Sequence, residues 1–281
     1  MHPFLYRILT KSIGAFLNVL HLVAPKKSDA LAFQIFCTPR KGKIQLGKIP
    51  KVLQTAEKEI HNIADHDIAV YRFPGNGKKI LLVHGWESNS KRWKKLLPYL
   101  KKAQFDIYAI DAPAHGKSSG TLFTVPLYAE VIAAMIQKFG IQQLIAHSIG
   151  GSASIYALHK SNPETVEKAA ILGAPSDLDV LISNYARILS LRPRNVRGLT
   201  QTFSTRFNVE TQMFSSKIFV KSLQIKGFVA HDAHDDVVAF SESEKIIANW
   251  KDVTFVPTKK LGHSLHDANL YQQLLSFLKA S

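Results

Sequence analysis

One stretch of the sequence decides the fold: residues 142–151 read QQLIAHSIGG. Its first half is a short apolar run typical of a buried strand, and the two glycines after Ser148 suit a sharp turn into a helix. A serine at such a turn presents its hydroxyl above the sheet, while the amide of Ile149 lies at a helix N-terminus, where negative charge is favoured. Taken alone, however, the pattern favours a serine that merely caps a helix.

Outward from this stretch, the chain from Ile68 onward alternates short apolar runs with amphipathic stretches. Strands are expected at residues 79–84, 105–110, 142–147, 169–173, 223–231 and 253–257. Helices are expected at residues 90–102, 126–139, 149–160, 241–250 and 266–279. This order predicts an α/β fold with a doubly wound, mostly parallel sheet.

Two segments depart from the alternation. Residues 175–221 lack the strand pattern and are expected to form two or three helices, the clearest at residues 178–191, that make a helical lid. Residues 1–66 are expected to be an N-terminal amphipathic helix and extension, in which residues 51–63 form a further helix. The body that contains the sheet is then expected at residues 67–281.

The leading helix carries apolar residues at helical spacing, and Pro25 is expected to end it. The charges at Arg7 and Lys11 make it a poor membrane span. Three interpretations stay open: the helix docks on the protein's own body, lies on a membrane surface, or acts as a signal or anchor.

Further loops belong to the same predicted edge of the sheet. Residues 84–86 (HGW) follow an earlier strand, and the amide of Trp86 can point at the crevice that Ile149 faces, although Gly85 and Trp86 could equally serve as a turn and a packed side chain. Later, residues 231–238 read HDAHDDVV and residues 261–264 read LGHS. The carboxyl ends of parallel strands converge on one crevice, so a serine, an acid and a histidine can meet there.

With these motifs in order, residues 68–280 resemble the α/β-hydrolase superfamily. Residues 84–86 resemble its oxyanion loop, residues 111–118 (DAPAHGKS) its Asp-x-Pro-x-His-Gly-x-Ser loop, and residues 146–150 (AHSIG) its nucleophile elbow. The first position of that elbow is normally glycine and is Ala146 here, which keeps a small residue at the turn.

The resemblance implies a role for each site residue. Ser148 is the expected nucleophile and His263 the general base, while the family's acid motif aligns with His231 and Asp235 and so selects Asp235 over Asp232 and Asp236. The expected oxyanion hole and its supporting loops comprise Trp86 and Ile149, with His84, Gly85, His147 and Gly150.

Two other interpretations of these motifs are set aside. His231, His234, Asp235 and Asp236 are metal ligands by type, but the serine and histidine motifs would then be coincidences, so no metal and no cofactor is expected. Residues 116–118 (GKS) imitate the end of a phosphate-binding loop, but the glycine that such a loop needs five positions earlier is Asp111.

The amino-acid composition indicates which binding partners and which cellular compartment to expect. The 36 Lys and Arg residues against 21 Asp and Glu residues give a net charge of +15, which attracts anionic membrane surfaces or acidic substrates. These cations are scattered without interleaved aromatics, so nucleic-acid binding is not expected. The lone cysteine, Cys37, cannot form an internal disulfide, which is in keeping with a cytoplasmic protein, membrane-associated if the leading helix binds lipid.

We therefore expect a serine esterase, lipase-like in family, that cleaves a small-molecule carboxylic ester or a related acyl bond through an acyl-enzyme intermediate. The basic lid residues have two interpretations: with the apolar residues beside them they would favour substrates with an anionic end, or they form a solvated basic helix face, which is the preferred interpretation for any single arginine. Two alternatives stay open: a non-catalytic binding protein that keeps the fold, and a membrane-surface lipase or thioesterase. The natural substrate and the oligomeric state do not follow from the sequence.

Overall fold

The computed structural model describes residues 3–45 and 47–280. Residues 1, 2 and 46 of the predicted extension, and residue 281 of the predicted hydrolase body, lie outside the described residues. The described chain forms two compact units, one from Met1–Thr38 and Asp177–Ser215 and the other from Pro39–Ser176 and Ser216–Ser281. Each unit therefore combines segments that are far apart in the sequence.

The larger unit is built on a sheet that, within the described residues, has eight strands in the order β1-β2-β4-β3-β5-β6-β7-β8. The strands are β1 (Glu57–Ile63), β2 (His66–Phe73), β3 (Lys79–Val83), β4 (Asp106–Ile110), β5 (Gln143–His147), β6 (Lys168–Leu172), β7 (Lys226–Asp232) and β8 (Val253–Thr258). β2 pairs antiparallel with β1 and with β4, and all later pairs are parallel. This confirms the predicted α/β fold.

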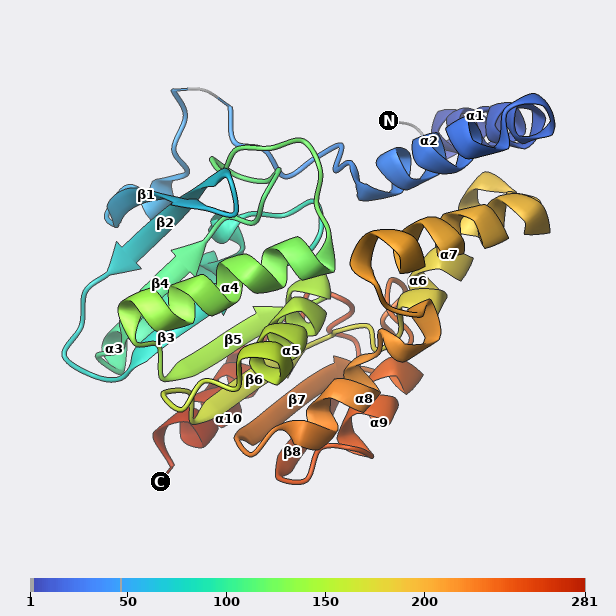
Figure 1. Ribbon diagram of the computed structural model, residues 1–281. Coiled ribbons are helices and arrows are strands. Elements are labelled where there is room, and N and C mark those ends of the chain that lie inside the picture. Colours follow the sequence, from blue (N-terminus) through green and yellow to red (C-terminus); the bar gives the residue numbers. More distant parts are fainter. Residues whose placement is uncertain (1–2, 46, 281) are drawn as a thin grey trace. The chain divides into compact units, whose positions relative to one another are not determined.

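Helices cover both faces of this sheet (Figure 1). α4 (Val125–Phe139) and α5 (Ile149–Ser161) lie on one face, and α3 (Leu97–Lys102) and α10 (Ala268–Lys279) lie on the other. Ile80 and Leu82 share a buried cluster with Leu97 and Leu274, because alternate residues of a strand point to the same face. Two further α-helices of this unit are α8 (Ser216–Phe219) and α9 (Phe240–Ile247).

Two predicted helices are wrong in part. Residues 51–63 form a 3-10 turn, Lys51–Leu53, followed by strand β1. The turn at Ala64 and Asp65, with φ of 50° and 58°, folds β1 back onto β2, and both strands of this hairpin were missed. The helix expected at residues 90–102 is a 3-10 segment, Ser90–Lys95, and then α3, because a proline in the first turn restarts the helix.

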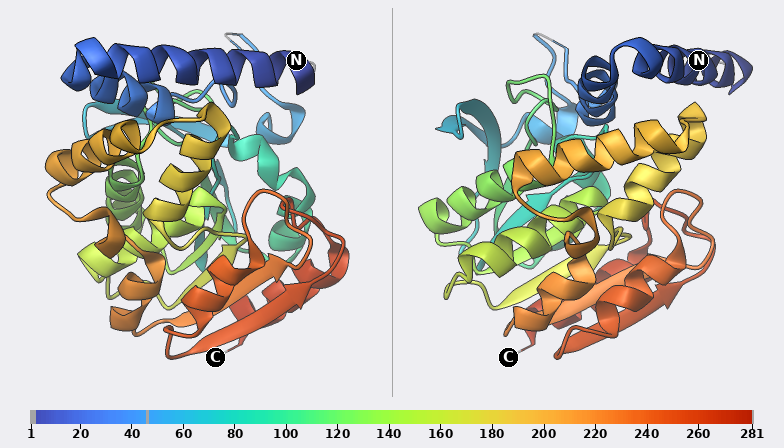
Figure 2. Two further views of the ribbon diagram at one scale, coloured as in Figure 1. Left: turned by 90° about the vertical axis from the view of Figure 1, so that its right-hand side faces the viewer. Right: turned by 45° about the vertical axis from the view of Figure 1, so that its right-hand side comes forward.

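The smaller unit combines helices from two segments that lie far apart in the sequence (Figure 2). α1 (Pro3–Val23) ends before Pro25, as predicted, and α2 (Pro25–Cys37) starts at that proline. The inserted helices α6 (Leu178–Leu189) and α7 (Pro193–Phe207) pack with them. The Phe33 and Phe203 rings, from α2 and α7, lie 4.9 Å apart between centroids.

These compact units differ from the predicted division at residues 66 and 67. The sheet-bearing unit begins at Pro39, because the hairpin of β1 and β2 belongs to the sheet. The N-terminal helices belong instead with the inserted helices of residues 177–215. A lid function for the insertion stays a prediction.

A glycine sets the distance between α1 and α6. A Cβ atom at Gly14 would lie 1.6 Å from the backbone oxygen of Leu189, so no larger residue fits without moving the helices apart. The next residue, Ala15, is exposed.

We expect Gly14→Val to destabilise the smaller unit by about 1–3 kcal/mol, because the added side chain must push α1 away from α6. The matched control is Ala15→Val, which adds a β-branched side chain to the exposed side of the same helix. Amide hydrogen exchange of α1 and α6 should rise in Gly14→Val and stay close to wild type in Ala15→Val. Equal exchange in the two variants would contradict this helix contact.

Candidate active site

Ser148 stands at the turn between β5 and α5 in a conformation that few side-chain-bearing residues adopt, with φ 55° and ψ −134°. Its amide donates a 2.8 Å hydrogen bond to the carbonyl of Leu172 at the end of β6. A Cβ atom at Gly150 would lie 2.4 Å from the carbonyl oxygen of His84, so this turn needs a glycine there. The Ser148 side chain makes no capping hydrogen bond to α5, which leaves its hydroxyl available for other contacts.

The loop after β3 approaches Ser148 closely. A Cβ atom at Gly85 would lie 2.8 Å from the Cβ atom of Ser148. His84 holds this loop: its Nδ1 donates to the carbonyl of Gly85 at 2.7 Å, and its Nε2 accepts from the amide of Ala112 at 2.9 Å. Burial lowers the pKa of His84 to about 4, so the ring is neutral and can make both hydrogen bonds.

The two amides predicted to form an oxyanion hole, those of Trp86 and Ile149, belong to the residues that directly follow Gly85 and Ser148. Within residues 3–45 and 47–280, neither amide donates a hydrogen bond to another group of the protein. Glu87, the neighbour of Trp86, is held by a 3.0 Å hydrogen bond from its amide to Nε2 of His115. The loop is thus fixed on both sides of Trp86.

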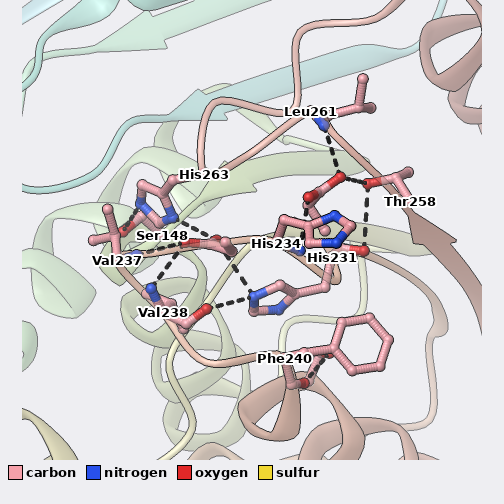
Figure 3. A network of polar contacts seen from close by, with 12 residues as sticks. Ser148, His231, His234, Val237, Val238, Phe240, Thr258, Leu261 and His263 are labelled. Carbon is pink, nitrogen blue, oxygen red and sulfur yellow. Dashed lines mark hydrogen bonds and ion pairs between the residues drawn. The ribbon is translucent and has the colours of Figure 1, made fainter.

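His263 bridges Ser148 and Asp235 (Figure 3). Its Nδ1 lies 2.8 Å from Oδ2 of Asp235, and its Nε2 lies 3.0 Å from Oγ of Ser148. An ionised carboxylate only accepts hydrogen bonds, so Nδ1 carries the proton and Nε2 of the neutral ring accepts from the serine hydroxyl. The structure brings the three predicted residues together from the ends of β5, β7 and β8.

Asp235 is held as an anion although its side chain is fully buried. Burial by itself would raise the pKa of Asp235, but hydrogen bonds from His231, from His263 and from the amides of Val238 and Val237 outweigh it and hold the pKa below its ordinary value. The two amides both lie 2.9 Å from Oδ1, which leaves Oδ2 for the histidines. The carboxylate is therefore positioned as well as charged.

The other two acids of this segment have different environments. Asp232 is buried and joins the two late loops: its Oδ2 accepts from the hydroxyl of Thr258 and the amide of Leu261, both at 2.8 Å, and its Oδ1 accepts from the amide of His234. Asp236 is exposed. The sequence alone left the choice among the three acids to the family resemblance, and only Asp235 contacts His263 in the structure.

His147 supports the loop of residues 261–264, which contains His263. Its Nε2 donates to the carbonyl of His263 at 2.8 Å, and the two rings lie 4.7 Å apart between centroids. Burial, together with the positive charge of Arg92, holds the pKa of His147 well below its ordinary value, so this ring stays neutral.

Two residues that position this site were not predicted. Arg92 donates a 2.9 Å hydrogen bond to the carbonyl of Ser264, next to His263, and burial lowers its pKa to about 9. Gly173, with φ 59°, ends β6 where a Cβ atom would lie 3.6 Å from both Oδ2 of Asp235 and Nδ1 of His263. A glycine directly after a buried strand was the available signal for Gly173, whereas Arg92 in a run of basic residues gave none.

The loop of residues 111–118 is a structural support. The carboxylate of Asp111 accepts from the amides of Ser90 and Lys117 and from the hydroxyl of Tyr71. Gly116, with φ 50°, touches that carboxylate so closely that a Cβ atom would lie 1.9 Å from it. The lysine of the GKS sequence points elsewhere, since its Nζ donates to the carbonyl of Gln45.

The side chains of His231, Asp232 and Asp235 are engaged in hydrogen bonds and ion pairs within the protein, and Asp236 is exposed. No group of three or more His, Cys, Asp or Glu side chains in the part of the chain that the structure describes is arranged to hold a metal ion.

Comparison with known proteins places this architecture in a class. The family model described as the alpha/beta hydrolase fold matches residues 78–254. The chain therefore belongs to the alpha/beta hydrolase family, whose members include esterase-type relatives of this protein.

Particular relatives share parts of the sequence. A serine hydrolase-like protein of Danio rerio is 32% identical over 126 residues, which cover 41% of this chain and 37% of the relative. A pimeloyl-[acyl-carrier protein] methyl ester esterase of Aeromonas hydrophila is 28% identical over 174 residues, 60% of this chain and 61% of the relative. The chain spans less than two thirds of the length of either relative.

A solved structure extends the likeness in fold. An esterase from Exiguobacterium antarcticum superposes with a TM-score of 0.63 at 16% identity, over 80% of this chain and 100% of that chain. At this identity the likeness concerns the fold alone.

We expect Asp232→Asn to destabilise the two late loops by about 1–3 kcal/mol, because the amide group cannot accept all the hydrogen bonds that the buried carboxylate accepts. Asp236→Asn is the matched control, since the same change is made four positions along on an exposed residue. Urea unfolding measures both. A variant at Asp236 that loses as much stability as the one at Asp232 would overturn this assignment.

The lowered pKa of Asp235 also makes the free energy of unfolding depend on pH. The charged form stabilises the folded state above the unfolded pKa of about 3.9, and this contribution is lost as pH falls through the lower folded pKa. Wild type should therefore exceed Asp235→Asn in unfolding free energy at pH 7, and the difference should shrink below about pH 4. A difference that stays constant between pH 7 and pH 3 would show that the carboxylate's charge is not what stabilises the fold.

Proposed function

We propose that this protein is a serine hydrolase that cleaves carboxylic esters. The observation that carries the proposal is the position of the His263 ring, 3.0 Å from Oγ of Ser148 on one side and 2.8 Å from Oδ2 of Asp235 on the other. A neutral histidine in this tautomer is a general base aimed at a serine hydroxyl, which is what an activated nucleophile requires.

In the proposed reaction, Oγ of Ser148 attacks the ester carbonyl carbon while its proton passes to Nε2 of His263. Asp235 stabilises the resulting imidazolium. The carbonyl oxygen becomes negatively charged and accepts hydrogen bonds from the amides of Trp86 and Ile149, and the dipole of α5 favours the same charge. Their freedom from other partners within the described residues suits this task.

The tetrahedral intermediate then collapses. The bond to the leaving oxygen breaks, His263 returns its proton to that oxygen, and the alcohol departs, which leaves the acyl group esterified to Ser148. Water attacks the acyl carbon in the second half, with His263 again taking and returning one proton. The products are one carboxylic acid and one alcohol, and the enzyme returns to its starting state.

The names of relatives support esters as the substrate class. One relative is a methyl ester esterase and another, from Acinetobacter calcoaceticus, is a bifunctional esterase/perhydrolase, 28% identical over 111 residues. Both names describe chemistry at an acyl carbon. These names support an acyl ester as the substrate, and a panel of aryl esters of increasing chain length would measure the preferred size of the acyl group.

We expect a fluorophosphonate probe to label the wild-type chain and to leave Ser148→Ala unlabelled. Hydrolysis of an aryl ester should fall at least about 10⁴-fold in that variant, because the nucleophile is lost while the fold is kept. Gel fluorescence and steady-state kinetics measure the two effects.

The matched control is Ser264→Ala, which removes an exposed hydroxyl beside His263 but keeps the backbone carbonyl that Arg92 contacts. It should label as wild type does. Folded wild-type protein that resists the probe would instead support a non-catalytic binding protein with this fold.

A further inference from the structure

The leading helix α1 exposes one apolar face. The large apolar side chains on this face are between 47% and 80% exposed and are Leu5, Ile8, Leu9, Phe16, Val19, Leu22 and Val23. At 100° per residue they fall within an arc of about 140°, which also contains the exposed Ser12 and Ala15. This apolar face runs along nearly the whole helix.

The opposite face of α1 is mostly polar and is turned inward within its unit, with Leu17 as its fully buried apolar side chain. Nζ of Lys11 donates to the carbonyl of Arg187 and to the hydroxyl of Ser190. Asn18 donates to the carbonyl of Ser190 and accepts from the amide of Arg192, at 2.9 Å and 2.8 Å. An amphipathic helix of a water-soluble domain normally buries its apolar side, so α1 has the reverse arrangement.

Gly14 makes this orientation specific. It lies on the inward side, where its missing side chain lets α1 approach the carbonyl of Leu189. Rotating the helix to bury the apolar face would break these hydrogen bonds and bring bulky side chains to a contact that only glycine fits. The exposure of the apolar face is therefore set by the packing of α1 on α6.

The exposed charged side chains of α1 and of the first turn of α2 are cations. Arg7, Lys26 and Lys27 are exposed at the two ends of α1, and Arg187 and Arg192 are exposed on the segments that bind its polar side. No acidic residue precedes Asp29 in the sequence. An apolar strip flanked by cations is complementary to a bilayer surface that contains anionic lipids.

We propose that α1 is an interfacial helix whose apolar face inserts into the surface of an anionic membrane. The helix lies in the plane of the interface: among the helices of residues 3–45 and 47–280, none combines the length and apolarity that a crossing needs. A second copy of the chain fits the face less well, because pairing two such faces brings the flanking cations of both copies together. This proposal does not depend on the hydrolase activity.

Vesicle binding by the full chain tests the proposed membrane insertion of α1. Ser12→Cys places a single reactive thiol at the centre of the apolar face, because the native Cys37 is buried and its burial raises the pKa to about 12. An environment-sensitive fluorophore on that thiol should shift to the blue with vesicles of phosphatidylcholine and phosphatidylglycerol. The shift should weaken with added salt and with phosphatidylcholine alone.

The decisive comparison uses two double variants. Phe16→Gln with Val19→Gln should lower partition into these vesicles about tenfold or more in co-sedimentation, because it removes apolar area from the face. Ile60→Gln with Met213→Gln is the matched control, since these side chains are 59% and 54% exposed and do not belong to α1, and it should bind as wild type does. Circular dichroism shows whether both variants fold.

Three results would overturn the proposal. They are a wild-type chain that does not sediment with the anionic vesicles, equal losses in the two double variants, and a dimer in analytical ultracentrifugation that Phe16→Gln with Val19→Gln dissociates while vesicles have no effect. The last result would assign the face to a second copy.

Discussion

The conformation of Ser148 is the constraint on which the rest of the larger unit depends. A residue with a side chain is held at φ 55° between β5 and α5, and this is possible because neighbouring chain segments come unusually close. Glycines stand at 85 and 150 where any Cβ atom would collide with Ser148 or with His84. Such strain persists only where the surrounding structure enforces it, and the parallel strands β3, β5 and β6 supply that surrounding here.

The loops that follow β7 and β8 face Ser148 with buried polar groups, and hydrogen bonds among these groups fix their positions. Asp232 joins the loop after β7 to the loop after β8 through the amide of Leu261. Asp235 orients the His263 ring, and His147 donates a hydrogen bond to the carbonyl of His263. Each histidine with a lowered pKa is neutral and can donate through one nitrogen only, so its tautomer is set by its partner. The positions of His263 and Asp235 thus follow from these hydrogen bonds.

The parallel core and the order of the site motifs could be predicted from the sequence, because buried parallel strands are short apolar runs and their carboxyl ends share one edge. The β1–β2 hairpin was missed because Glu57, Lys58 and Glu59 follow one another without alternation, and all are exposed. The choice of Asp235 needed coordinates, since three acids lie within five positions. The packing of α1 on α6 could not be predicted, because it depends on contacts between residues far apart in the sequence, such as Gly14 and Leu189.

The proposed reaction passes through a covalent intermediate at Ser148. The most direct measurement is rapid mixing of the protein with a slowly deacylated aryl ester, followed by mass spectrometry of the quenched chain. We expect a burst of about one leaving group per chain and an acyl mass on the peptide that contains Ser148. Turnover of the ester with no acyl group on that peptide, or with the acyl group on another residue, would contradict it.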